Sequence, residues 1–144
     1  MESSKETILI TGITGYIGSA IGKVFLDMGG DRYNYKAAVR NISNPARLDP
    51  LRLAYGDNFN KVNFVEADLS NKESLIKAIE GCQYIIHVAN PIPSSRQKAS
   101  IEELVRPARE GMQIIIDAAV HNRVKRIVVT SSTSSIIGTL WKHK

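Results

Sequence analysis

The sequence predicts an α/β fold in which about five parallel strands form a doubly wound sheet with helices on both faces. Short apolar runs alternate along the 144-residue chain with longer segments whose apolar residues recur at helical spacing. The short runs are apolar on both faces, which is typical of strands inside a parallel sheet. A turn with three glycines, at Gly12, Gly15 and Gly18, separates the first strand from the first helix. We expect one domain, because this length suffices for a single core.

The composition is that of a globular domain. Hydrophobic residues make up 43% and charged residues 23% of the chain, and no apolar stretch approaches the roughly 20 residues of a membrane helix. The polar N-terminus shows no targeting signal and the single cysteine, Cys82, cannot form an internal disulfide, so we expect a cytoplasmic protein. The net charge of +5 suits an anionic ligand, but a solvated surface with a basic C-terminal tail explains it equally well.

The first strand and the first helix flank the glycine turn. Thr7–Thr11 is short, apolar and β-branched, as expected of a buried strand. The helix that follows the turn has one apolar face and ends at Gly29-Gly30. The residues expected on that buried face are Ile17, Ala20, Ile21, Val24, Phe25 and Met28.

The next predicted elements are a strand, a helix and another strand. We expect the second strand at Tyr33–Val39 and the third at Val62–Val65. A helix is expected after Asn44-Pro45, because proline suits the first turn of a helix.

Two Ser-x-x-Glu sequences are expected to begin the next two helices, since such a serine and glutamate cap each other's backbone. Ser70-x-x-Glu73 begins a helix that Gly81 ends, and Ser100-x-x-Glu103 begins a long one. Pro107 lies within the long pattern and indicates a kink or a later start. The apolar side of the long helix is expected to comprise Ile101, Leu104, Val105, Ala108, Met112, Ile115 and Ala119.

The fourth and fifth strands are expected at Tyr84–Val88 and Ile127–Thr130. The sheet is expected to be incomplete at its C-terminal edge, which leaves Ile127-Val128-Val129 uncovered. Because exposed apolar edges pair with other chains, we expect self-association through this strand.

The glycine turn is expected to bind the pyrophosphate of a dinucleotide. Ligands of doubly wound sheets bind beyond the C-terminal ends of the strands, where the strand order reverses. There Gly12 would allow the tight turn, Gly15 the close approach of the pyrophosphate, and Gly18 the packing of helix on strand. The N–H groups at the start of the helix would hold the phosphate charge. Glycines that serve only a turn are the alternative, which the flanking strand and amphipathic helix disfavour.

The residue after the second strand favours NADP over NAD. A carboxylate here would accept hydrogen bonds from the ribose hydroxyls and repel a 2′-phosphate. The chain has Arg40 instead, and Arg47 follows at the start of the second predicted helix. Arginine forms bidentate, charge-assisted hydrogen bonds with phosphate. Two solvated surface arginines are the alternative interpretation.

Several motifs together resemble the extended short-chain dehydrogenase/reductase superfamily of NAD-dependent epimerase/dehydratase type, which implies a Rossmann-type fold. They are TGITGYIG in the glycine turn, VEADLS after the third strand and HVANP after the fourth. VRPAREGMQIIIDAA and VKRIVVTSS resemble the family's fourth helix and fifth strand. HVANP and VRPAREG look most like the dihydroflavonol-reductase-like group. The resemblance covers the chain from Thr7 to about Ser135.

The resemblance implies which residues contact the cofactor. Asp68 would lie against the adenine, and Val88 and Ala89 on the nicotinamide side. An aspartate just past a strand also commonly caps the next turn, so that interpretation of Asp68 stays open. The residues expected to bind the cofactor are Gly12, Gly15, Tyr16, Ile17, Gly18, Arg40, Arg47, Asp68, Leu69, Val88 and Ala89.

Hydroxyl residues after the fifth strand are the catalytic candidates. In the family that the chain resembles, a serine here polarises the substrate carbonyl, and alignment on VVTSS makes it Ser132. Ser131 is the competitor, because a slip of one residue turns the side chain to the other face. The hydroxyls could instead satisfy backbone groups where the strand ends. The family's serine works with a Tyr-x-x-x-Lys pair, and no tyrosine of this sequence is followed by lysine at that spacing.

Two functions therefore stay open. In the first, residues 1–144 are a fragment, the dinucleotide-binding domain of an NADP-dependent reductase of carbonyl or alcohol substrates, ending before the catalytic helix and substrate-binding region. In the second, the chain is a dinucleotide-binding sensor or interaction protein without turnover. Neither needs nucleic acid, a membrane or a metal, and no His/Cys cluster has metal-ligand spacing. Cys82 and His87 are expected to be core or strand-end residues. We expect no turnover from these residues alone.

Overall fold

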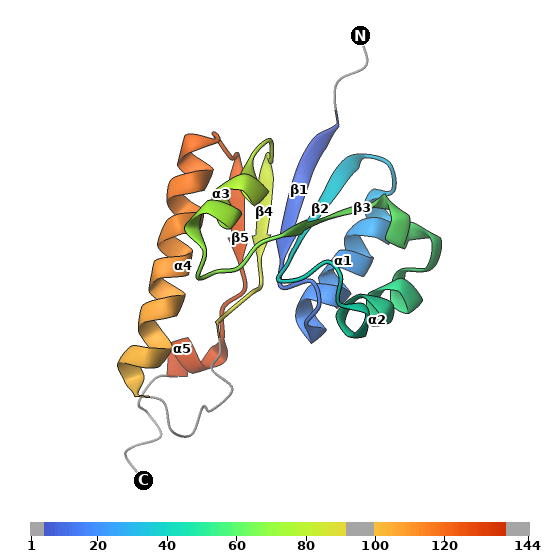
Figure 1. The fold of residues 1–144 in the computed structure, drawn as a ribbon. Coiled ribbons are helices and arrows are strands. Elements are labelled where there is room, and N and C mark those ends of the chain that lie inside the picture. The colour runs from blue at the N-terminus through green and yellow to red at the C-terminus, as the bar shows by residue number, and fades with distance from the viewer. Residues whose placement is uncertain (1–4, 92–99, 138–144) are drawn as a thin grey trace.

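Five parallel strands form one sheet in the computed structural model, which describes residues 5–91 and 100–137 (Figure 1). The strand order is β3-β2-β1-β4-β5, so β1 is central and the order reverses beside it. The predicted fold class is confirmed, with each strand within one residue of its expected bounds. The strands are β1 (Glu6–Thr11), β2 (Tyr33–Val39), β3 (Val62–Glu66), β4 (Tyr84–His87) and β5 (Arg126–Val129).

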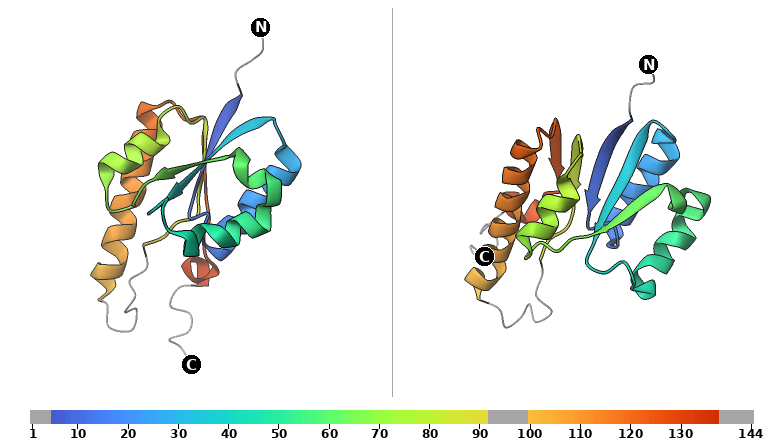
Figure 2. Two further views of the ribbon diagram at one scale, coloured as in Figure 1. Left: turned by 45° about the vertical axis from the view of Figure 1, so that its right-hand side comes forward. Right: turned by 45° about the horizontal axis from the view of Figure 1, so that its top comes forward.

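Helices cover both faces of the sheet (Figure 2). One face carries α1 (Tyr16–Gly29), α2 (Pro45–Tyr55) and a 3-10 helix, η1 (Gly56–Lys61). The other carries α3 (Lys72–Ile79) and α4 (Ile101–His121), and a short helix, α5 (Thr133–Ile137), follows β5.

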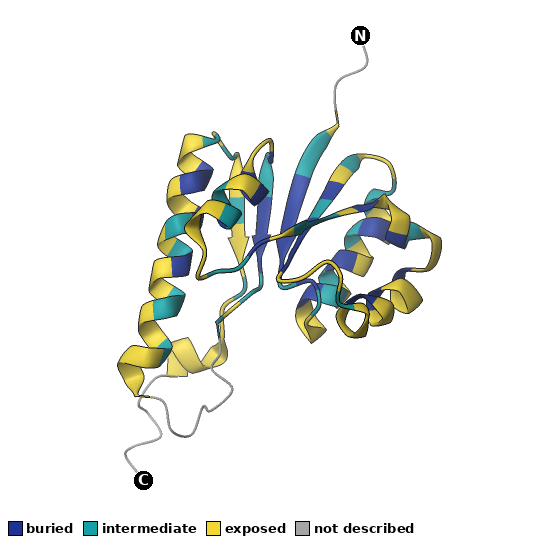
Figure 3. Cartoon of the chain, viewed as in Figure 1, coloured by how far each residue is buried: buried dark blue, intermediate teal, exposed yellow. Residues whose placement is uncertain are grey.

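The sheet separates two apolar cores, and alternate residues of β1 serve each of them. Ile8 and Ile10 pack toward α1 and α2, whereas Leu9 packs toward α3 and α4. Burial declines toward β5, where Val128 and Val129 are 52% and 47% exposed (Figure 3). Within the described residues β5 has a neighbouring strand on one side only, so it is an edge of the sheet.

The buried face of α1 differs from the predicted one. Four residues predicted to be buried are exposed, namely Ile17, Ala20, Val24 and Met28. Gly18, Gly22 and Leu26 are buried instead. A Cβ atom added at Gly22 would overlap the Tyr55 hydroxyl. The helix therefore packs through its glycines, and this close approach turns part of its apolar stripe toward solvent.

The capping box predicted at Ser70 and Glu73 is wrong. The N-cap of α3 is Asn71, whose Oδ1 accepts a hydrogen bond from the Ser74 N–H at 3.0 Å. Ser70 lies one residue too early because its hydroxyl and its N–H both donate to Asp68. The turn after β3 therefore holds Ser70 outside the helix.

The capping box of α4 is confirmed, but the buried face again differs. The Glu103 N–H donates to Ser100 Oγ at 3.2 Å, and the Ser100 N–H donates to Glu103 Oε2 at 2.7 Å. Pro107 lies inside the helix and does not delay its start. Ile101 and Val105 are exposed, because the first turns of α4 extend beyond the strands (Figure 1). The buried residues are Gly111, Ile115, Ala118 and Ala119.

Candidate functional site

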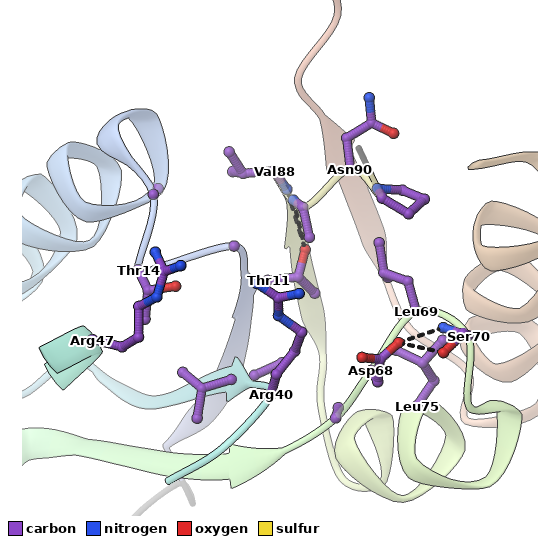
Figure 4. A pocket seen from close by; sticks show the side chains of 18 of the residues that line it. Thr11, Thr14, Arg40, Arg47, Asp68, Leu69, Ser70, Leu75, Val88 and Asn90 are labelled. Atoms are coloured by element: carbon purple, nitrogen blue, oxygen red, sulfur yellow. Dashed lines mark hydrogen bonds between the residues drawn. The ribbon is translucent and has the colours of Figure 1, made fainter. Parts of the chain in front are cut away.

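A cavity of about 730 Å³ opens at the C-terminal ends of the strands (Figure 4). Its walls come from the turn after β1, the end of β2, the turn after β3 and the segment after β4. The cavity lies where the strand order reverses, which is where doubly wound sheets bind ligands. The structure brings all the expected cofactor-binding residues to it, namely Gly12, Gly15, Tyr16, Ile17, Gly18, Arg40, Arg47, Asp68, Leu69, Val88 and Ala89.

Two glycines of the turn are required by the fold itself. Gly12 has a φ of 72°, in the left-handed region, and a Cβ atom there would lie 2.7 Å from the Ala89 nitrogen. A Cβ atom at Gly18 would overlap the Gly12 carbonyl. These glycines let the turn pack against both the segment after β4 and the first turn of α1.

Gly15 differs, because the protein leaves space beside it. Its φ of −91° suits any residue, and an added Cβ atom would meet only the Gly12 carbonyl oxygen, at 3.3 Å. Gly15 is also the N-cap of α1, where no side chain caps the helix and the first turn holds no acidic residue. The N–H groups of the first turn of α1 are therefore available to an anion, which the helix dipole would attract.

Thr11 joins the glycine turn to the segment after β4. Its hydroxyl accepts hydrogen bonds from the N–H groups of Val88 and Ala89, both at 3.2 Å (Figure 4). The two walls of the cavity are thereby tied together at their base. Sequence analysis did not single out Thr11, although its place directly before Gly12 in the motif was an available signal.

Arg40 and Arg47 form the basic side of the site. Figure 4 shows the Arg40 side chain extending from the end of β2 into the cavity, and Arg47 beside Thr14. The arginines share a smaller recess of about 310 Å³, and none of the described residues that line it is acidic. The lining residues are Thr14, Val39, Arg40, Asn41, Asn44 and Arg47. Sequence analysis missed Thr14, Asn41 and Asn44, which carry no charge.

A carboxylate lies close to this loop but is already engaged. Glu66, which pairs with Val39 across β2 and β3, accepts a hydrogen bond from the Ile42 N–H at 3.0 Å. Its charge therefore stabilises the loop after β2 from outside the recess.

Asp68 caps its own turn at the opposite side of the cavity. Its Oδ1 accepts hydrogen bonds from the Ser70 hydroxyl at 2.6 Å and the Ser70 N–H at 2.8 Å. These bonds, assisted by the charge of Arg40, lower the pKa of Asp68 below its ordinary value. The capping interpretation left open above is thus correct for the carboxylate, and Asp68 and Leu69 still line the cavity.

The structure does not bring the catalytic candidates to the cavity. Ser132 Oγ accepts a hydrogen bond from the Ser134 N–H at 3.2 Å, and Ser131 Oγ lies 3.2 Å from Ser135 Oγ. Ser131 and Ser132 are exposed, and neither lines the cavity. Their hydroxyls serve the start of α5.

The described part of the chain contains neither a metal site nor a helix that could span a membrane. No group of three His, Cys, Asp or Glu side chains there could hold a metal ion. Cys82 and His87 are buried, as expected of core or strand-end residues. Among the described helices, none has the length and apolar character needed to cross a membrane.

Several known proteins similar to this chain are named as reductases. Residues 8–142 match the NAD dependent epimerase/dehydratase family. Cinnamoyl-CoA reductase 1 of Arabidopsis thaliana is 35% identical over 131 residues, which are 91% of this chain and 35% of that protein. Dihydroflavonol 4-reductase of Hordeum vulgare is 34% identical over 137 residues, which are 94% of this chain and 37% of that protein.

A solved structure extends the likeness to three dimensions. Vestitone reductase from alfalfa (Medicago sativa) superimposes with a TM-score of 0.68 and is 34% identical, over 90% of this chain and 37% of that one. The chain therefore spans between 35% and 37% of the length of each of these relatives.

Proposed function

The chain belongs to the NAD dependent epimerase/dehydratase family, and from this premise we propose that it forms the dinucleotide-binding domain of an NADP-dependent reductase. The substrate class would be a small carbonyl compound or the corresponding alcohol, as the names of its reductase relatives suggest. One observation carries the proposal. The cavity at the reversal of strand order has an uncapped helix N-terminus on one side and two arginines on another.

The described residues fit a dinucleotide along the whole cavity. The pyrophosphate would lie over Gly15, held by the N–H groups of the first turn of α1. The adenine would lie toward Asp68 and Leu69, and the nicotinamide toward Val88 and Ala89. When bound, the dinucleotide supplies or accepts the hydride, while these residues hold and orient it.

The choice of NADP rests on the recess that Arg40 and Arg47 share with Thr14. A 2′-phosphate placed there would receive charge-assisted hydrogen bonds from two guanidinium groups and lie beside the Thr14 hydroxyl. A ribose without phosphate would leave both cations unpaired. Since Glu66 is engaged with Ile42, no carboxylate of the described residues in this loop is offered to the ribose hydroxyls.

For the catalytic step, Ser132 is the proposed residue that polarises the carbonyl, and Ser131 is its competitor. Both follow β5 at the end of the sheet where the cavity opens. Their hydroxyls now bond within their own segment, so one of them must rotate to meet a substrate.

A second candidate function is dinucleotide binding without turnover. Two observations favour it: Ser132 does not line the cavity, and no tyrosine of the sequence is followed four residues later by lysine. A Tyr-x-x-x-Lys sequence encoded in the same reading frame beyond Lys144 would support the first function, because the family's serine works with that pair. An assay of NADPH oxidation in the presence of aldehydes and ketones tests the second function. Turnover by the 144-residue chain would exclude the second.

We propose the cellular compartment from one residue, Cys82, and self-association from one strand, β5. The buried free thiol of Cys82 supports a reducing compartment, such as the cytoplasm. The exposed edge at β5 supports self-association, since unpaired strand edges bind other strands.

Calorimetric titration with NADP⁺ and NAD⁺ tests the cofactor proposal. We expect the chain to bind NADP⁺ more tightly, and Arg40→Asp to weaken NADP⁺ binding by roughly 2–4 kcal/mol while NAD⁺ binding changes little. The loss combines a missing charge-assisted hydrogen bond with new repulsion of the phosphate. Arg126→Asp is the matched control, because this substitution makes the same change of charge at the start of β5, at the end of the sheet opposite the cavity. Equal losses for both cofactors would contradict the assignment.

A further inference from the structure

A buried polar pair lies behind the cavity, where β1 and β4 end. Thr11 and His87 stand opposite each other in the register of the two strands. The Thr11 hydroxyl and the His87 Nδ1 are 2.8 Å apart, and the residues are 2% and 7% exposed. His87 does not line the cavity, and the proposed function makes no use of its imidazole.

The hydrogen bonds of Thr11 determine which nitrogen of His87 carries the proton. A hydroxyl has one proton and two acceptor positions. The N–H groups of Val88 and Ala89 occupy both acceptor positions of Thr11. The Thr11 proton must therefore be donated to His87 Nδ1, which has to be unprotonated, and the neutral ring carries its proton on Nε2.

Protonation of His87 is incompatible with this arrangement. A proton on Nδ1 would point at an oxygen whose acceptor positions are both filled, so Thr11 would have to release Val88 or Ala89. The Thr130 N–H holds the His87 carbonyl at 3.0 Å, which fixes the backbone of His87, and burial of the residue restricts rotation of the imidazole away from Thr11. The Ala89 nitrogen also packs directly against Gly12, so a shift there reaches the glycine turn.

The surroundings of His87 favour the neutral ring. Burial lowers the pKa of His87 below its ordinary value. On the adjoining strands, Glu6 of β1 and Arg126 of β5 lie at the ends far from His87. Asp68 accepts hydrogen bonds from Ser70, and Arg40 lines the cavity, which His87 does not. The charged or titratable residues of the helices on this face are all exposed, namely Lys72, Glu73, Lys77, Glu102, Glu103, Arg106, Arg109, Glu110, Asp117 and His121.

We infer that His87 is a positioning residue that acts through Thr11 on the backbone of Val88 and Ala89, so that the nucleotide site keeps its shape only while the imidazole is neutral. This inference rests on the proposed function, because it concerns the same cavity. It makes dinucleotide affinity depend on pH through a group that never touches the ligand.

The test compares the chain with its His87→Asn variant by calorimetric titration with NADP⁺ from about pH 8 downward. Asparagine places an oxygen acceptor where His87 has Nδ1 and cannot be protonated in this range. The two proteins are expected to bind alike at neutral pH. Below the pKa of His87 the original chain should lose affinity relative to the variant, by up to about tenfold per pH unit. The 2′-phosphate also titrates near pH 6, and its effect cancels in this comparison.

Two further measurements keep the outcomes separate. Circular dichroism at each pH shows whether the fold persists, and long-range ¹H–¹⁵N spectra report the tautomer of His87, whose signal is absent from His87→Asn. Identical pH profiles for the two proteins, or a neutral ring protonated on Nδ1, would overturn the inference. So would an acid loss of binding that only follows unfolding. Failure of NADP⁺ to bind at neutral pH would refute the proposed function. The tautomer of His87, read from the ¹H–¹⁵N spectra, would still test the inference about the Thr11–His87 pair.

Discussion

At the scale of single residues, Gly15 differs from Gly12 and Gly18 because the fold itself does not require a glycine at position 15. Gly12 and Gly18 face backbone atoms of the protein itself, so their side chains are excluded by the fold. Gly15 has an ordinary φ and faces the cavity. A side chain at position 15 would project into the space proposed for the pyrophosphate.

We therefore predict that Gly15→Val abolishes NADP⁺ binding and leaves the fold intact. The β-branched side chain would block the approach of the phosphates to the first turn of α1. Calorimetry measures the binding and circular dichroism the fold. Ala20→Val is the matched control, because it introduces the same side chain at an exposed position of α1 that does not line the cavity, and it should keep NADP⁺ binding. Retained binding in Gly15→Val would mean that the turn does not hold a pyrophosphate.

At the scale of elements, α1 is positioned by its glycines and by a tyrosine from α2. The Tyr55 hydroxyl donates a hydrogen bond to the Ser19 carbonyl at 2.9 Å, directly over Gly22. Burial raises the pKa of Tyr55 to about 12. Because the folded protein favours the neutral phenol, this contribution to stability is complete below the ordinary tyrosine pKa and is lost as the pH rises through about 12.

A double-mutant cycle tests this contact. Gly22→Ala adds a methyl group that overlaps the Tyr55 hydroxyl, so we expect it to destabilise the fold by about 1–3 kcal/mol although alanine favours helix. Tyr55→Phe alone should cost about 1 kcal/mol. In the double variant the missing hydroxyl makes room for the methyl group. The free energy of unfolding, measured with urea, should therefore fall by less in the double variant than the sum of the losses in the two single variants. Strict additivity would show that the two residues do not meet.

At the scale of the whole molecule, helices cover both faces of the sheet, but β5 is poorly buried and lies at an edge. Its backbone donors and acceptors on the outer side have no strand partner among the described residues. Val128 and Val129 add an apolar surface to this edge. Such an edge offers a template for another strand.

We predict that the 144-residue chain self-associates and that Val128→Lys reduces the association, because a lysine on an edge strand opposes pairing. Size-exclusion chromatography with light scattering measures the mass as a function of concentration. Val120→Lys, which replaces an exposed valine on α4, is the control and should leave the mass unchanged. A monomer at all concentrations, or an equal effect of both variants, would contradict this role of β5.

The sequence by itself determined the order of the elements and one end of the site. Strands and helices follow from local periodicity, and β2 was predicted to its last residue. The glycine motif located the turn after β1, and the residue after β2 located the basic side. These features depend on neighbours in the chain, so a pattern of local residue types is sufficient to predict them.

Only the tertiary structure decided which surfaces meet. Periodicity gave α1 an apolar stripe, but the contact of Gly22 with Tyr55 rotated part of it toward solvent. The place of Ser132 outside the cavity and the pairing of Thr11 with His87 also required the fold. Thr11 and His87 are 76 residues apart, and the sequence contains no local signal that one fills the hydrogen bonds of the other. Such contacts depend on how strands pair and helices pack, which a local pattern does not specify.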